Sequence, residues 1–324
     1  MIANRRKCLR GVIIGFVFAS TVWMIALMKK SYGSRYFETR MRNTSEKFHV
    51  ETMETWNPNI TVITAYFDLG TFPKGNLGTH YTRDMYFNWA TTFKFLRNPI
   101  VVYTDSETFK QHMYTLRQGL MNMTKIFLIK RSTSWAFKNI DKIRALFSSY
   151  NYPKHYPNTV IAEYACAQHA KYDVVARAAE QECFGTKYYM WLDIGYFRDR
   201  VNKKRSFRFL EPEDFDENRI AMTRIYSDHH LNVTPKTIFL NNLVYVGGGL
   251  VFGKKQQIVK FASQVKQTVN YFLEQNLTNT DQQVIYAMFS KEGQKVIKPE
   301  VKLQCYKPPT DQNWFYLGNK MTSK

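Results

Sequence analysis

Short apolar runs alternate with longer amphipathic stretches along most of this chain. The short runs are rich in β-branched and aromatic residues and predict strands at residues 59–67, 99–104, 125–129, 187–197 and 241–253. The longer stretches carry apolar residues at helical spacing and predict helices at residues 81–96, 106–119, 158–184 and 258–273, with another beginning at Thr280. Such alternation is typical of an α/β fold with a mostly parallel sheet flanked by helices.

The run at residues 187–197 carries one carboxylate and one glycine near its end. Its continuity predicts a central strand covered on both faces, and ligands of open α/β sheets gather beyond the carboxyl ends of such strands. Asp193 is therefore placed to hold a metal-bound phosphate or a sugar hydroxyl, and Gly195 lets a ligand approach the backbone. The alternative is that Asp193 only caps a turn.

Three consecutive glycines, Gly247, Gly248 and Gly249, lie between apolar residues of the 241–253 run. They predict close approach of another backbone or a sugar ring, or else a glycine bulge at a corner of the sheet. They match neither G-x-G-x-x-G nor a P-loop, and the chain has no G-x-S-x-G or H-E-x-x-H motif, so dehydrogenase, NTPase, triad hydrolase and zinc protease chemistry lack support. Asp281 follows Thr280, a natural N-cap, and has either a chemical role or only a helix-start role.

The N-terminal region predicts a membrane anchor. Residues 11–28 are uncharged, flanked by basic residues on both sides, and just long enough to span a bilayer as an uncleaved signal anchor. We therefore expect a cytoplasmic tail at residues 1–10, a lumenal stem at residues 29–57 and a lumenal body at residues 58–324, as in a type II membrane protein of the Golgi or endoplasmic reticulum. Five N-x-[ST] sequons agree with a lumenal body, at Asn43, Asn59, Asn122, Asn232 and Asn276.

The net charge of +20 suggests a polyanionic partner or a nucleotide-linked substrate. Nucleic acid fits poorly with a lumenal body, and the basic run at residues 198–208 predicts a solvated loop. Cys166 and Cys183, about 25 Å apart along one predicted helix, should not pair. A disulfide would join Cys305 to one of them; three buried free thiols are the alternative.

Taken together, the ordered motifs resemble the HtrL/YibB-like (WlaTC/HtrL) glycosyltransferases over residues 58–316. The resemblance is carried by the segments T-V-I-T-A-Y-F-D-L-G at 61–70, V-V-Y-T-D at 101–105, Lys171, W-L-D-I-G at 191–195, the three glycines and T-D-Q at 280–282.

The resemblance implies a GT-A-like catalytic domain that transfers a sugar from a nucleotide-sugar donor to a glycan or glycoconjugate acceptor, with Mn²⁺ or Mg²⁺ as the candidate cofactor. Asp193 would be the sole motif ligand of the metal, because Gly195 replaces the second aspartate of Asp-x-Asp; Asp228-His229-His230 could supply another ligand but fits a solvated loop better. Asp281 would be the general base. Donor-binding residues would be Asp68, Arg83, Asp105, Lys171, Asp193 and Gly195, and acceptor-binding residues Gly247, Gly248 and Gly249.

Two other classes of protein remain open. The missing second aspartate leaves room for a catalytically inactive, membrane-anchored carbohydrate-binding or scaffold protein. The charge leaves room for a polyanion-binding surface protein.

Overall fold

The computed structural model describes residues 58–75, 78–227 and 230–322. The strands are β1 (Ile60–Tyr66), β2 (Phe72–Pro73), β3 (His80–Tyr81), β4 (Ile100–Thr104), β5 (Thr124–Leu128), β6 (Tyr188–Leu192), β7 (Arg219–Arg224), β8 (Val246–Lys254) and β9 (Lys302–Tyr306). The α-helices are α2 (Arg83–Ala90), α3 (Glu107–Leu116), α4 (Trp135–Lys138), α5 (Ile140–Ser148), α6 (Ala162–Gln181), α7 (Pro235–Leu240), α8 (Lys255–Glu274), α9 (Asp281–Phe289), α10 (Lys291–Ile297) and α11 (Tyr316–Thr322).

The body at residues 58–322 is built on a 7-stranded sheet with the order β5-β4-β1-β6-β8-β7-β9. The pairs of β5, β4, β1 and β6 are parallel, β8 runs antiparallel to both β6 and β7, and β7 pairs with β9 in parallel. The predicted α/β class with a mostly parallel sheet is therefore confirmed. The sequence patterns did not predict β7 and β9. Both strands are short, and polar side chains lie within them or at their ends.

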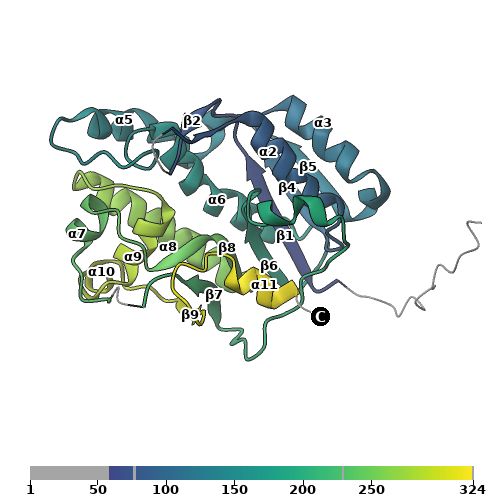
Figure 1. The fold of residues 1–324 in the computed structure, drawn as a ribbon. Coiled ribbons are helices and arrows are strands. Elements are labelled where there is room, and N and C mark those ends of the chain that lie inside the picture. Colours follow the sequence, from purple (N-terminus) through teal and green to yellow (C-terminus); the bar gives the residue numbers. More distant parts are fainter. Residues whose placement is uncertain (1–57, 76–77, 228–229, 323–324) are drawn as a thin grey trace, which may run out of the picture. The chain divides into compact units, whose positions relative to one another are not determined.

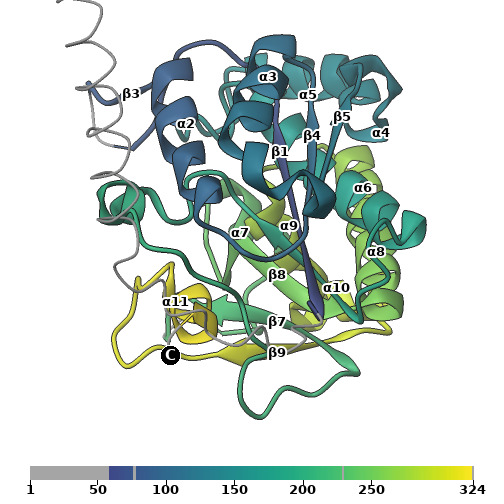
Figure 2. The same ribbon diagram turned by 90° about the vertical axis from the view of Figure 1, so that its right-hand side faces the viewer.

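Helices cover both faces of the sheet, as Figures 1 and 2 show. On one face α6, α8 and α9 pack on strand residues such as Ile63, Tyr103 and Trp191. On the other face α2, α3 and α11 pack on the alternate residues, such as Val62 and Met190. Because successive strand residues point to opposite faces, two buried faces require the continuous apolar runs seen in the sequence.

Most predicted helices are present, with shifted ends. The helix predicted at 158–184 is α6, which begins after Ile161 and ends where Glu182 adopts a left-handed backbone conformation. The strand predicted at 241–253 was placed too early: Asn242 has a φ of 53°, a turn conformation, and β8 begins only at Val246. Cys166, Cys183 and Cys305 are free thiols, as the alternative expected, but only Cys166 is buried, and the other two are half-buried.

The predicted anchor, tail, stem and Asn43 lie outside the described residues and stay predictions. No helix at residues 58–75, 78–227 and 230–322 is long and apolar enough to cross a membrane. The other four sequon asparagines, Asn59, Asn122, Asn232 and Asn276, are exposed, which modification would require.

The order of the strands fixes where a ligand can bind. From β1 the chain moves to β4 and β5 on one side, and then returns to β6 on the other side of β1. In doubly wound sheets this reversal opens a crevice at the carboxyl ends of the two diverging strands. Here those ends are Tyr66 on β1 and Leu192 on β6, directly before Asp193.

Candidate functional site

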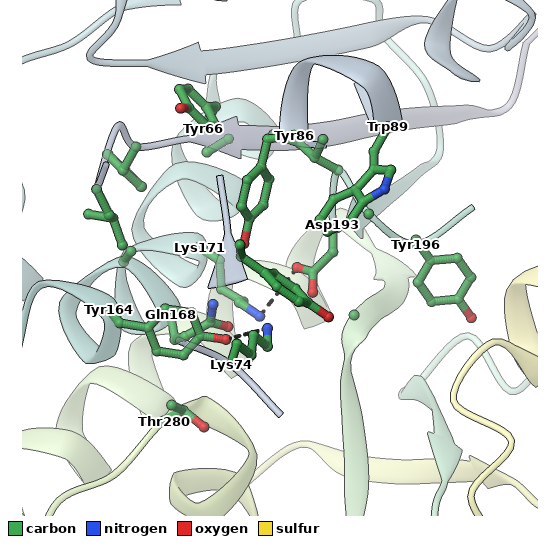
Figure 3. A pocket seen from close by; sticks show the side chains of 18 of the residues that line it. Tyr66, Lys74, Tyr86, Trp89, Tyr164, Gln168, Lys171, Asp193, Tyr196 and Thr280 are labelled. Carbon is green, nitrogen blue, oxygen red and sulfur yellow. Dashed lines mark hydrogen bonds and ion pairs between the residues drawn. The ribbon is translucent and has the colours of Figure 1, made fainter. Parts of the chain in front are cut away.

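A cavity of about 340 Å³ lies at this crevice, within the range of small-molecule sites. It is lined by the end of β1, the loop after β6, the β2–β3 hairpin, α2 and α6 (Figure 3). Of the residues predicted for the site, Asp193, Gly195, Lys171 and Gly249 line this cavity.

Asp193 is the one carboxylate among the described residues that line the cavity. Its side chain is 41% exposed, and its Oδ1 accepts a hydrogen bond from Trp191 Nε1 at 2.7 Å. Lys171 Nζ lies 3.5 Å from the same oxygen. Two donors thus hold Oδ1, which leaves Oδ2 for a ligand.

Lys171 connects Asp193 to a second carboxylate below the cavity. Its Nζ lies 3.0 Å from Asp281 Oδ2 and donates to the Gly248 carbonyl at 3.0 Å. The Lys171 and Asp281 side chains are only 2% and 1% exposed. Burial acts to lower the pKa of Lys171, but the charges of Asp193 and Asp281 act more strongly together and raise it, so the ammonium is charged.

Asp281 does not line the cavity, although the sequence made it the candidate base. Its Oδ2 faces Lys171 and accepts from the Tyr172 hydroxyl at 3.2 Å, and its Oδ1 is buried without a hydrogen-bond partner in the described part of the chain. A general base must reach the proton it removes. The geometry therefore favours a role for Asp281 through Lys171, and its role as the base stays a prediction.

Protein side chains fill the room beside the glycines that were predicted to contact an acceptor. A Cβ at Gly248 would lie 2.1 Å from Asp281 Oδ2, and one at Gly247 would lie 3.0 Å from an Ile225 methyl carbon. Only Gly249 of the three reaches the cavity. Gly195 lines the cavity as well, but a Cβ there would lie 2.9 Å from the Trp89 ring, so this glycine also serves packing.

An interaction network beside the cavity, outside its lining, joins Asp68, Asp105 and Arg83. Arg83 binds Asp68 Oδ2 at 2.5 Å, and Asp105 Oδ1 accepts from the Asp68 backbone N–H at 2.8 Å. Arg131, which the sequence patterns did not single out, binds both Asp105 and the Asp68 carbonyl. The structure shows these residues holding the loop that follows β1. Donor binding by them stays a prediction.

Aromatic side chains form much of the cavity wall, and the sequence patterns did not assign them to the site. They include Tyr66, Tyr81, Tyr86, Trp89, Tyr164, Tyr196, Trp314 and Phe315. Figure 3 shows Lys171 between Tyr86 and Tyr164, with the Asp193 carboxylate directed toward the Lys171 ammonium. Aromatic rings stack on sugar rings and on nucleobases, and they also keep water out.

The lining is poorly suited to hold a divalent cation by itself. Hard cations need several oxygen ligands, and where the protein supplies one carboxylate, substrate phosphates and water must supply the others. Asp193 supplies one free carboxylate oxygen and lies beside the Lys171 ammonium, and no group of three or more potential ligands from His, Cys, Asp and Glu occurs in the described segments. Residues 228–229, part of the second suggested ligand group, are outside those segments.

Comparisons with known proteins agree with the predicted family. Protein HtrL of Escherichia coli (strain K12) is 25% identical over 244 residues, which is 71% of this chain and 84% of that protein. A solved glycosyltransferase involved in the glycosylation of the major capsid of PBCV-1 aligns with 78% of this chain and 82% of its own, at 13% identity and a TM-score of 0.36. The model of the family HtrL_YibB, described as "Bacterial protein of unknown function", matches residues 58–297. The chain belongs to the HtrL_YibB family.

Proposed function

We propose that this protein is a glycosyltransferase that moves a sugar from a nucleotide-sugar donor to a glycan or glycoconjugate acceptor. The observation that carries the proposal is the Asp193 carboxylate, which is held through Oδ1 and lines an aromatic cavity. This cavity lies at the crevice of a doubly wound sheet. The aromatic wall suits a nucleobase and a sugar ring. The surrounding cations suit a phosphate.

In this proposal Asp193 Oδ2 accepts the proton of the acceptor hydroxyl. The acceptor oxygen forms a bond to the anomeric carbon, and the bond from that carbon to the donor phosphate breaks, with its electron pair leaving on the nucleoside diphosphate. Trp191 and Lys171 orient the carboxylate through its other oxygen. A positioned base of this kind contributes about 10²- to 10⁴-fold to the rate.

The test is a screen of nucleotide-sugar donors with the purified full-length chain, scored by release of nucleoside diphosphate with and without glycan acceptors. We expect one donor class to turn over, and Asp193→Asn to reduce turnover by at least about 100-fold. Asp199→Asn is the matched control, because Asp199 is an exposed carboxylate outside the cavity lining. No turnover with any donor, together with retained glycan binding, would instead favour the inactive carbohydrate-binding protein.

We also propose that residues 11–28 anchor the protein in a membrane of the secretory pathway with the body in the lumen. The uncharged length of that segment and the exposed sequon asparagines support this arrangement. Full-length protein should resist alkaline carbonate extraction and lose mass on treatment with an N-glycosidase. A soluble product of unchanged mass would contradict the proposal.

A further inference from the structure

Among the described residues, three cations line the cavity, and two of them have no acidic partner there. Lys171 is already bound by two carboxylates. Lys74 and Arg198 make no ion pair with any acidic residue at 58–75, 78–227 or 230–322. Cations that line a cavity without a counter-ion favour an anionic ligand, because hydrogen bonds between charged groups and phosphate oxygens are strong.

Lys74 is held in place by aromatic groups. Its ammonium donates to the Tyr164 hydroxyl at 2.7 Å and lies 5.1 Å and 5.0 Å from the ring centres of Tyr81 and Tyr164. Figure 3 shows it beside Tyr164, on the side of the cavity where Lys171 also lies. Only one of its three N–H donors is used by a hydrogen bond within the described chain, which leaves two for a ligand.

Arg198 begins a short 3₁₀-helix, η4 (Arg198–Lys203), which follows the turn after β6. Its guanidinium lies 4.9 Å from the Phe315 ring centre, and its Nη1 makes a long hydrogen bond of 3.4 Å to the Gly195 carbonyl. Guanidinium groups bind phosphate oxygens through paired donors. Arg198 therefore offers a second phosphate contact, a short distance along the chain from Asp193.

We propose that Lys74 and Arg198 bind the diphosphate of the donor and stabilise it as it leaves, in the role that a metal held by two aspartates would otherwise take. This rests on the proposed function and assigns its phosphate subsite. Lys171 then holds Asp193 and does not bind phosphate. Donor binding consequently needs no divalent cation.

The test is calorimetric titration of the full-length chain with UDP, GDP, CDP, ADP and inorganic pyrophosphate, each in EDTA and in Mn²⁺. We expect one nucleoside diphosphate to bind in EDTA within about threefold of its affinity in Mn²⁺. Lys74→Met and Arg198→Met should each weaken binding in EDTA by about tenfold or more, as for lost charge-assisted hydrogen bonds. Lys74→Arg should recover part of the loss.

Arg208→Met is the matched control, because it removes the same charge from an exposed position ten residues along the chain, outside the cavity lining. It should change affinity by less than about twofold. Strong binding that requires Mn²⁺, or equal effects of the Arg198 and Arg208 variants, would overturn the inference and leave the proposed function standing. Pyrophosphate binding that depends on Lys74, without binding of any nucleoside diphosphate, would support an anion site and refute a nucleotide-sugar donor as its ligand. Absence of binding by every probe would refute both.

Discussion

The buried ion pair of Lys171 and Asp281 leads to a prediction about the free energy of unfolding. This prediction distinguishes a structural role of Asp281 from a catalytic one. Asp281→Asn is nearly isosteric and removes only the charge that faces the ammonium at 3.0 Å. Since both side chains are at most 2% exposed, the ammonium left behind is buried with one partner fewer. Breaking such a pair costs about 3–5 kcal/mol. For a body of this size, that loss lowers the melting temperature by at least about 6 °C.

Asp193→Asn is the internal control, because Asp193 contacts the same Nζ at 3.5 Å but is 41% exposed. A pair that is open to solvent contributes at most about 1 kcal/mol. Urea unfolding followed by tryptophan fluorescence measures both variants. In the double variant of Lys171→Met with Asp281→Asn, the loss should be smaller than the sum of the two single losses, since neither charge then remains without its partner. Equal, small losses for the two asparagine variants would refute the buried ion pair.

Three further predictions concern single contacts. Gly248→Ala should destabilise the protein by about 2 kcal/mol or more in thermal unfolding, because its methyl group would lie 2.1 Å from Asp281 Oδ2; an unchanged melting temperature would contradict this packing. Trp191→Phe removes the 2.7 Å hydrogen bond to Asp193 and should lower turnover about tenfold while donor affinity is retained. A loss of donor affinity would instead place the indole in the donor site. Burial lowers the pKa of His169 to about 4, so between pH 6.5 and pH 4 the unfolded chain binds a proton that the folded chain does not. The free energy of unfolding therefore falls as the pH drops through this window, by about 2 kcal/mol at pH 5. The difference in unfolding free energy between the wild type and His169→Gln, measured at pH 7 and pH 5, should change by that amount, and a constant difference would mean that this imidazole does not titrate on unfolding.

The central strands could be predicted from the sequence because they are buried on both faces. β1, β4 and β6 contain almost only buried side chains, so each appears as a continuous apolar run. β9 is an edge strand with only half-buried or exposed side chains, and its composition does not separate it from a loop. Its place in the sheet depends on pairing with β7, a contact between distant segments that periodicity does not report.

Part of the candidate site was predictable for a related reason. Asp193 and Gly195 follow a recognisable central strand, and the edge of the sheet at which that strand ends is where ligands bind. Lys74 directly follows the two-residue strand β2, and Tyr164 belongs to α6, 90 residues further along the chain. No local spacing indicates that they approach each other. Arg131 likewise reaches the Asp68 carbonyl from 63 residues away.

The glycine at position 195 explains why one carboxylate stands alone at this strand end. A side chain there would begin 2.9 Å from the Trp89 ring, so a second aspartate would have to displace an aromatic residue that also lines the cavity. The charge beside Asp193 comes from Lys171 on α6 instead, and that ammonium is kept in place by Asp281 at the start of α9. Two carboxylates and one ammonium from three separate elements thus meet at this end of the strand. The position of the Asp193 carboxylate therefore depends on the packing of α6 and α9 as much as on the local sequence.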